Sequence, residues 1–298
     1  MLDNCNIRLY KPNIIDSVIR KELNQFTKNG VIYYQGKINN LFIKVSQDNL
    51  EIRNSVKKYI NDNPNYDLSR LDLLKVIERL SNSLGVDVSE SKITKLESGI
   101  TIETEKSPPN YIQKFGIGKN MILTAYGVNA KAYSITNKQA PHRRAKSFIV
   151  YNKGLESKVD SNLLRIELKI PNRVKSSLAL ESPMTLNKVI QKEGFELLFN
   201  KLIGAYNMIT KHSESNYNYT KPTEFKDYVF NSTINSIQGF EKYYEDNRIR
   251  YLNNDISKYA YYEINKQLKE IYQSNQDNSL INEVEKKLNE RYNYLLNN

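Results

Sequence analysis

The sequence of 298 residues contains one cysteine, two histidines and no tryptophan. With Cys5 alone, no internal disulfide can form, and no cysteine cluster or Ser/His/Asp arrangement supports zinc or serine-hydrolase chemistry. No apolar run approaches the roughly 20 residues that a membrane span needs. The first residues also lack the layout of a signal peptide. These absences predict a cytoplasmic protein with no membrane partner.

Positive charge is in excess and is concentrated in one segment. The chain has 44 lysines and arginines against 33 acidic residues, a net charge of +11. Residues 138–175 contain ten basic and three acidic residues, so this eighth of the chain carries +7 of that excess. Such a segment favours a polyanionic partner. The alternative is that an AT-rich genome produces this wealth of Lys, Asn, Ile and Tyr without selection for binding.

The 22 tyrosines and 9 phenylalanines are ambiguous. Aromatic rings interleaved with basic residues can stack on unpaired bases. More often, such rings are core or half-buried strand residues.

The first half of the chain reads as short strands around one helix. Alternation of apolar and polar residues and turn-like stretches predict strands at 7–10, 31–34, 41–45, 50–53, 93–103, 121–126, 131–135, 147–153 and 163–170.

A helix is predicted at 68–84. It has Ser69 or Asp67 as N-cap and Gly85 at its end. Its apolar stripe is expected to consist of Leu71, Leu74, Ile77, Leu80 and Leu84.

After about residue 175 the pattern becomes helical. Helical spacing predicts helices at 185–211, with an interruption at Gly194, and at 224–243, 255–272 and 279–296. The fold class is therefore α+β, with an antiparallel-sheet catalytic core followed by an α-helical C-terminal region. We expect a catalytic domain over 1–176 and a helical region over 177–298 for DNA recognition or oligomerisation.

Three predicted strands, at 94–99, 148–153 and 164–169, carry charged residues between apolar neighbours. If these strands are adjacent, their polar faces converge. The residues brought together would be Glu97, Tyr151, Lys153, Arg165 and Glu167.

This combination of side chains suits phosphoryl chemistry. Carboxylates bind Mg²⁺ or Mn²⁺ through oxygen, and the ion polarises a phosphate. A tyrosine hydroxyl can attack phosphorus and form a covalent phosphotyrosine. Lys153 lies two residues beyond Tyr151, roughly 6.6 Å along a strand, where its charge would favour the phenolate. Glu156, just beyond the strand, ranks below Glu97 and Glu167 as a ligand.

The segment Phe148-Ile-Val-Tyr-Asn-Lys-Gly-Leu-Glu156 resembles the Tyr-x-Lys-x-x-Glu strand of rolling-circle replication initiators. These include the filamentous-phage proteins of the gene II/X type and the Gram-positive plasmid initiators. Leu164-Arg-Ile-Glu-Leu-Lys169 is similar to their following Arg-x-Glu strand. Residues 93–97 stand where that family has an Arg-aliphatic-Asp segment, with Lys95 and Glu97 here in place of Arg and Asp.

The resemblance implies an endonuclease that nicks a replication origin, leaving a 5′-phosphotyrosyl link and a free 3′-OH primer. It implies Tyr151 as nucleophile with Lys153 beside it, and Mg²⁺ or Mn²⁺ as cofactor. The implied metal ligands are Glu97 and Glu167, with Lys153 and Arg165 as supporting cations, and Glu156 is a further candidate ligand. The candidate DNA-binding residues are Arg143, Arg144, Lys146, Arg165 and Lys169.

The expected partners are single-stranded or cruciform origin DNA, a host helicase and a second copy in a homodimer. Since His142 and His212 are the only histidines, the paired-histidine form of such a metal site is excluded. Tyr133 is a candidate second tyrosine for strand closure.

Two other functions stay open. The chain can be a non-catalytic DNA-binding replication or regulatory protein on the same scaffold. It can also be a structural or interaction protein whose charge reflects genome composition. Binding alone needs neither Tyr151 nor the carboxylates, and the third possibility predicts no salt-dependent affinity for DNA.

Overall fold

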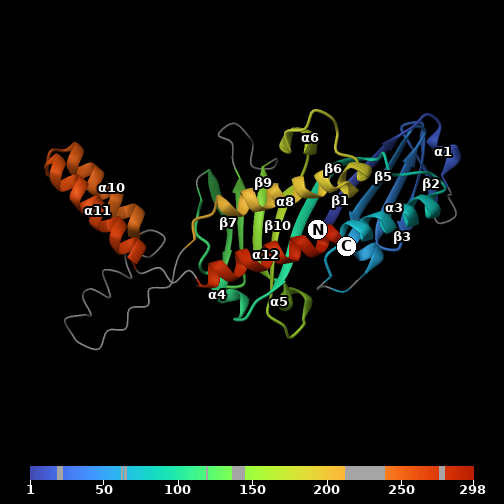
Figure 1. The fold of residues 1–298 in the computed structure, drawn as a ribbon. Coiled ribbons are helices and arrows are strands. Elements are labelled where there is room, and N and C mark those ends of the chain that lie inside the picture. Colours follow the sequence, from blue (N-terminus) through green and yellow to red (C-terminus); the bar gives the residue numbers. More distant parts are fainter. Residues whose placement is uncertain are drawn as a thin grey trace.

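One antiparallel sheet organises the molecule. The computed structural model describes residues 1–18, 23–61, 63, 66–118, 120–135, 145–211, 239–274 and 279–298. Within these residues, the strands form a ten-stranded sheet with the order β2-β3-β4-β5-β1-β6-β10-β9-β8-β7 (Figure 1). The strands are β1 (Leu2–Tyr10), β2 (Leu23–Lys28), β3 (Val31–Ile38), β4 (Leu41–Ser46), β5 (Asn49–Ser55), β6 (Lys92–Glu103), β7 (Met121–Gly127), β8 (Ala130–Ile135), β9 (Lys146–Asn152) and β10 (Leu163–Ile170).

The sheet consists of two halves with the same strand order. From the centre outwards, the first half reads β1, β5, β4, β3, β2 and the second reads β6, β10, β9, β8, β7. In each half a central strand is followed by a short helix and then by four consecutive strands that return from the outer edge. The central strands β1 and β6 pair with each other and join the halves.

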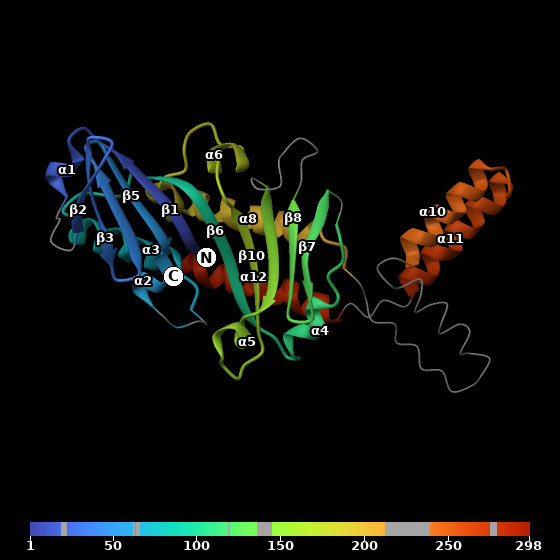
Figure 2. The same cartoon turned by 180° about the vertical axis from the view of Figure 1, so that it is seen from behind.

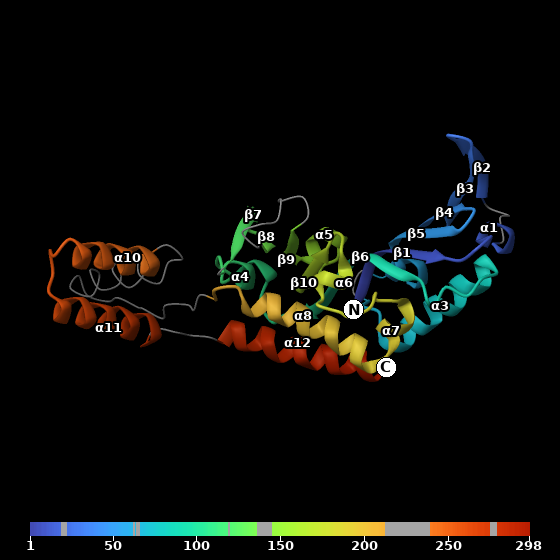
Figure 3. The ribbon, with the colours of Figure 1, turned by 90° about the horizontal axis from the view of Figure 1, so that it is seen from above.

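Helices cover one face of the sheet. Figure 3 shows α3, α7, α8 and α12 on the same side, and Figure 2 looks onto the opposite side, here called the open face. α10 and α11 pack against each other. The helices are α1 (Ile14–Ser17), α2 (Val56–Ile60), α3 (Arg70–Leu84), α4 (Pro108–Ile112), α5 (Lys153–Ser157), α6 (Val174–Ser177), α7 (Leu186–Ile190), α8 (Lys192–Asn207), α10 (Gly239–Leu252), α11 (Lys258–Ser274) and α12 (Ser279–Asn297).

Helix α3 begins and ends at the predicted caps. The Ser69 hydroxyl accepts from the Asp72 N–H while the Asp72 carboxylate accepts from the Ser69 N–H, and Gly85 takes a left-handed conformation at the end. The predicted apolar stripe was partly wrong. Leu71 and Leu74 are 47% and 37% exposed, whereas the buried stripe consists of Leu73, Val76, Ile77, Leu80 and Leu84.

The predicted helix at 185–211 is divided into α7 and α8. The break falls at Gln191, which has extended backbone, and not at Gly194 as predicted. Gly194 allows α7 and α8 to pack closely at this break. A Cβ there would lie 1.8 Å from the Lys188 carbonyl oxygen, so only glycine lets the two helices approach.

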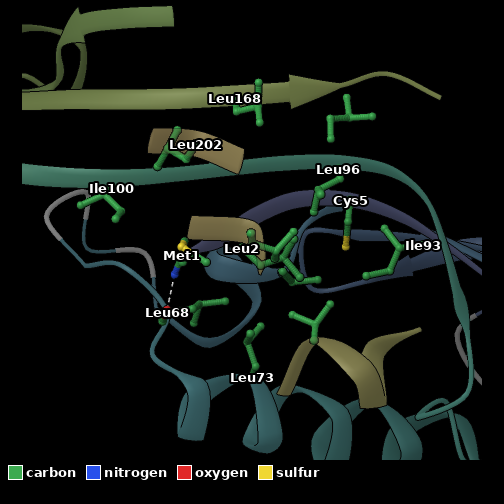
Figure 4. Close-up of a cluster of buried hydrophobic side chains, with 14 of the residues drawn as sticks. Met1, Leu2, Cys5, Leu68, Leu73, Ile93, Leu96, Ile100, Leu168 and Leu202 are labelled. Carbon is green, nitrogen blue, oxygen red and sulfur yellow. Dashed lines mark hydrogen bonds between the residues drawn. The ribbon is translucent and has the colours of Figure 1, made fainter. Parts of the chain in front are cut away.

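The hydrophobic core runs without interruption under both halves. Figure 4 shows its central part, where Leu2 and Cys5 of β1 and Leu96 and Ile100 of β6 meet Leu202 of α8. Helix α12 also packs on β6 and contributes Val284 and Leu288. Because C-terminal helices fill the core of the sheet, the sheet and these helices stabilise each other.

The predicted fold class, an antiparallel α+β sheet followed by a helical C-terminal region, is confirmed. The boundary between 176 and 177 stays a prediction. Of the predicted helix at 224–243, residues 224–238 lie outside the described residues. Over the described ranges, none of the helices is both long and apolar enough to cross a bilayer.

Candidate active site

Tyr151 lies on β9 in a row of residues that crosses the second half of the sheet. Its neighbour on β10 is Arg165, and Arg165 pairs with Thr101 on β6. Phe148 and Val150 on β9 and Leu164 and Ile166 on β10 face the core. Since side chains alternate along a strand, Tyr151 and Arg165 belong to the open face.

Arg165 is fully buried and is held by three oxygen atoms. Its Nη1 donates to Asp67 Oδ1 at 2.8 Å and to Thr101 Oγ1 at 2.9 Å, and its Nη2 donates to Asp3 Oδ2 at 2.9 Å. Gly99 makes room for this side chain, because a Cβ there would lie 2.9 Å from Nη2. The guanidinium is therefore fixed in position beside Tyr151.

Asp67 is the buried counterion of Arg165. It is 3% exposed, and its carboxylate also accepts from the Thr101 N–H at 2.7 Å. Burial raises the pKa of Asp67, but Arg165 together with the N-terminal amine, the Thr101 N–H and Lys57 outweighs this, so the pKa lies below its ordinary value. The pair is thus ionised inside the protein.

Glu97 and Glu167 are brought together, as predicted for adjacent strands. Lys169 Nζ lies 3.7 Å from Glu97 Oε2 and 3.6 Å from Glu167 Oε2. Lys95 also pairs with Glu97 at 2.8 Å, and Arg165 Nη2 lies 3.7 Å from Glu167 Oε1. Burial raises the pKa of Glu167 above its ordinary value, although Arg165 and Lys169 oppose this.

Lys153 lies near Tyr151, but not on the same strand face as predicted. The strand β9 ends at Asn152, and Lys153 is the first residue of α5, so the prediction of a shared strand face was wrong. The Asn152 side chain caps this helix by accepting from the Leu155 N–H. Lys153 Nζ nevertheless lies 5.8 Å from the centroid of the Tyr151 ring. It also forms an ion pair with Glu156.

The Tyr151 hydroxyl is protonated in the free protein. Burial raises its pKa strongly, the Arg165 guanidinium lowers it, and Glu167 and Glu156 raise it further. Among the described residues, no hydrogen-bond partner is found for this hydroxyl. It is therefore available to a substrate, provided that the proton is removed.

The carboxylate pair of Glu97 and Glu167 fits a hard divalent cation. Lys169 already places one positive charge between the two carboxylates. Mg²⁺ typically keeps several waters and binds through one or two carboxylates together with substrate phosphates. No cluster of three His, Cys, Asp or Glu side chains suited to a metal occurs in the described part of the chain. Glu156 is separated from this pair and bonded to Lys153.

The candidate DNA-binding residues have different surroundings. Arg165 is buried, and Lys169 bridges the two glutamates. Lys146 Nζ donates to the Ser177 carbonyl at 2.8 Å. Arg143, Arg144 and His142 lie outside the described residues, as does His212.

Tyr133, the candidate second tyrosine for strand closure, is fully buried on the helix-covered face. Its hydroxyl donates to the Phe115 carbonyl at 3.0 Å.

Three residues of the first half complete the site and were missed by the sequence reasoning. Asp3 binds Arg165, Asp67 pairs with it, and Lys57 of α2 is buried beside them. Burial and the nearby Arg165 lower the pKa of Lys57 to about 8. Asp67 was considered only as a helix cap. No local signal links these positions to Arg165, which lies 98 positions after Asp67 and 162 positions after Asp3.

Comparisons with known proteins give one structural likeness. No protein-family model matches the sequence, and no curated protein matches it significantly. The chain is similar to a solved structure of the rolling circle replication initiator protein from Geobacillus stearothermophilus. The TM-score is 0.39 and the sequence identity 10%, with 76% of this chain and 90% of that chain covered.

Proposed function

We propose that this chain is a DNA-nicking enzyme of the rolling-circle type, with Tyr151 as its nucleophile. The observation that carries the proposal is the row of Thr101, Arg165 and Tyr151, with Glu167 beside it. Arg165 pairs with Tyr151 across β9 and β10 and lies 3.7 Å from Glu167, and the charges of both Arg165 and Glu167 act on the Tyr151 hydroxyl, which has no hydrogen-bond partner among the described residues. A core or surface tyrosine needs none of these groups.

In the proposed reaction, the Tyr151 oxygen attacks a backbone phosphorus of single-stranded origin DNA. A Tyr151–phosphorus bond forms, and the bond from phosphorus to the 3′ oxygen breaks. The 3′ oxygen takes a proton and leaves as the primer hydroxyl, while the 5′ phosphate stays on the enzyme. Attack by a 3′-OH on this link reverses the step and rejoins the strand.

The charged groups near Tyr151 act on this step in opposite directions. Arg165 stabilises the phenolate relative to the phenol, which opposes the effect of burial. Lys153 Nζ lies 5.8 Å from the centroid of the same ring. The charges of Glu167, Glu156 and Asp3 raise the pKa of the hydroxyl, and of these carboxylates Glu167 and Glu156 are the proposed candidates to accept its proton. Arg165 acts as a positioning residue, because its bonds to Asp67, Asp3 and Thr101 hold it in place.

Glu97 and Glu167 are the proposed ligands of Mg²⁺ or Mn²⁺, with Lys169 moving aside. When bound, the ion would offset negative charge on the scissile phosphate. A host helicase and a second copy of this chain are proposed as further partners.

The test is covalent capture of DNA. The full chain is incubated with Mn²⁺ and labelled single-stranded oligonucleotides that cover replication origins, and adducts are sought on a denaturing gel. We expect an adduct with the parent chain and a loss of about a thousandfold or more with Tyr151→Phe, because the nucleophile is removed.

Tyr126→Phe is the matched control, because this ring is 74% exposed on β7 in the same half of the sheet. It should form the adduct like the parent. An adduct that persists in Tyr151→Phe would overturn the assignment of the nucleophile. No adduct from the parent across the library, together with salt-dependent binding, would favour a non-catalytic DNA-binding protein.

A further inference from the structure

We infer that the open face of the first half of the sheet binds single-stranded DNA by stacking bases on its aromatic rings. This surface, called the ring platform here, consists of Tyr10, Phe26, Tyr33 and Phe42 with the cations around them. The inference rests on the proposed function only for the choice of DNA. It requires neither Tyr151 nor a nick.

The rings of the platform lie on the face opposite the core. Ile43 and Val45 of β4 and Ile52 of β5 are buried under the sheet, so Phe42 and Lys44 point the other way. Phe26 and Tyr33 are paired across β2 and β3 and stack with centroids 5.1 Å apart and planes 17° apart. Both rings are only half-buried.

Each part of the platform combines a ring with a cation. Lys44 Nζ lies 4.3 Å from the centroid of Tyr33 and 5.8 Å from that of Phe26. Arg53 lies over Phe42 at 5.8 Å. Lys92 of β6 lies over Tyr10 at 5.6 Å.

Such pairs of a ring and a cation suit single-stranded DNA, because its bases stack on aromatic rings and its phosphates are attracted by positive charge. On binding, a base would take a ring face and the displaced cation would meet a phosphate.

The charge of this half suits a polyanion. The strands β1 to β5 contain five basic residues and two acidic ones. Both acids are already paired: Glu51 accepts from Arg8 and Arg53, and Asp3 accepts from Arg165. Arg8 and Arg53 stay 39% and 46% exposed at their side chains. The net positive charge of these strands is therefore exposed to solvent beside the rings.

The platform is continuous with the candidate active site. Asn6 of β1 pairs with Lys95 of β6, and the chain of ion pairs then runs through Glu97 to Lys169 and Glu167. From β3 to β9 there are six strand spacings of about 4.8 Å, roughly 29 Å in all. One extended single strand of DNA that lies across the sheet would therefore reach both the ring platform and the candidate active site.

The test measures binding separately from cleavage. The full chain carrying Tyr151→Phe is titrated against fluorescein-labelled oligo(dT), and anisotropy gives the affinity. In this background, Phe26→Leu with Tyr33→Leu removes both rings but keeps apolar bulk. We expect about a tenfold or greater loss of affinity for oligo(dT), because each stacked base contributes roughly 1–3 kcal/mol.

Three controls make the result specific. Tyr259→Leu removes a ring that is 78% exposed on α11 and should leave affinity unchanged. Mixed-sequence duplex DNA and an oligonucleotide of abasic sites offer no free bases, so the ring variant should bind both as its parent does. Lys44→Gln should instead weaken binding of all three DNA probes and lower the salt slope by about 0.7 for the single strands and about 0.9 for the duplex.

The inference is overturned if the ring variant keeps full affinity for oligo(dT), or if it loses equal affinity for the abasic and duplex probes. Tighter binding of oligo(U) than of oligo(dT) would overturn the assignment to DNA. Circular dichroism of each variant verifies that the sheet is intact. Because Tyr151 is absent throughout, a failure here is distinct from a failure to nick.

Discussion

The two halves of the sheet share a strand order but differ in where they place positively charged side chains. In the second half, Arg165 is fully buried and neutralised by Asp67 and Asp3. In the first half, Lys44 and Arg53 lie over half-buried rings, close to solvent. Burying a charge costs free energy unless an opposite charge is paired with it. The Arg165 guanidinium is therefore held in a fixed geometry, which suits chemistry. The first half keeps its cations beside aromatic rings, with Arg53 partly exposed, which suits binding.

The largest predicted effect is the loss of Arg165. Arg165→Ala leaves Asp67 buried without its main counterion, so we expect a loss of about 3–5 kcal/mol in the free energy of unfolding. Arg53→Ala removes an arginine that is 46% exposed in the first half, and should cost at most about 1 kcal/mol. Urea unfolding monitored by circular dichroism measures both. Equal losses would contradict the proposed difference between the halves.

A smaller effect is expected at Gly99, which makes room for Arg165. In Gly99→Ala, the new Cβ would lie 2.9 Å from both Arg165 Nη2 and the Ile166 carbonyl oxygen. We expect a loss of about 1–3 kcal/mol in stability, with a weaker adduct signal because the guanidinium shifts. The control is Gly204→Ala in α8, where nothing lies within 4 Å of the new Cβ. It should stabilise the chain by about 0.5–1 kcal/mol.

The smallest effect concerns Glu167 and depends on pH. Burial raises the folded-state pKa of Glu167 above its ordinary value of 4.5. Its contribution to stability is therefore fully present below that value and is lost as pH rises above it. Glu167→Gln cannot ionise, so its stability relative to the parent should increase between pH 4 and pH 7.

Thermal unfolding of both chains over this pH range measures the difference. A relative stability that is constant or falls with pH would contradict the assigned pKa direction. The same variant should lose adduct formation, since Glu167 is a proposed ligand and proton acceptor.

Local patterns predicted most of the elements near the site. Alternation along 163–170 and 93–103 identified β10 and β6, and the convergence of Glu97 and Glu167 was predicted only on the condition that these strands are adjacent. The capping residues Ser69 and Gly85 located α3. The strand β2 and the short helices α1, α2, α4, α5 and α6 were not predicted, because four to six residues contain too few periods for a pattern to be recognised.

Errors arose where tertiary packing overrides the local pattern. Leu71 and Leu74 have the spacing of a core stripe, yet the docking of α3 on the sheet selects Leu73 and Val76 instead. Lys153 continues the alternation of β9, but the Asn152 cap turns the chain into α5 one residue earlier.

The sequence by itself determined the α+β class, the helical C-terminal region and the candidates Tyr151, Glu97 and Glu167, since these depend on periodicity and residue type. Only the tertiary structure decided that Asp3 and Asp67 enclose Arg165, and that cations lie over the rings of β2 to β5. The physical reason is that both arrangements depend on strand register and on the pairing of β1 with β6. Contacts between residues so distant in the chain leave no local periodic signal.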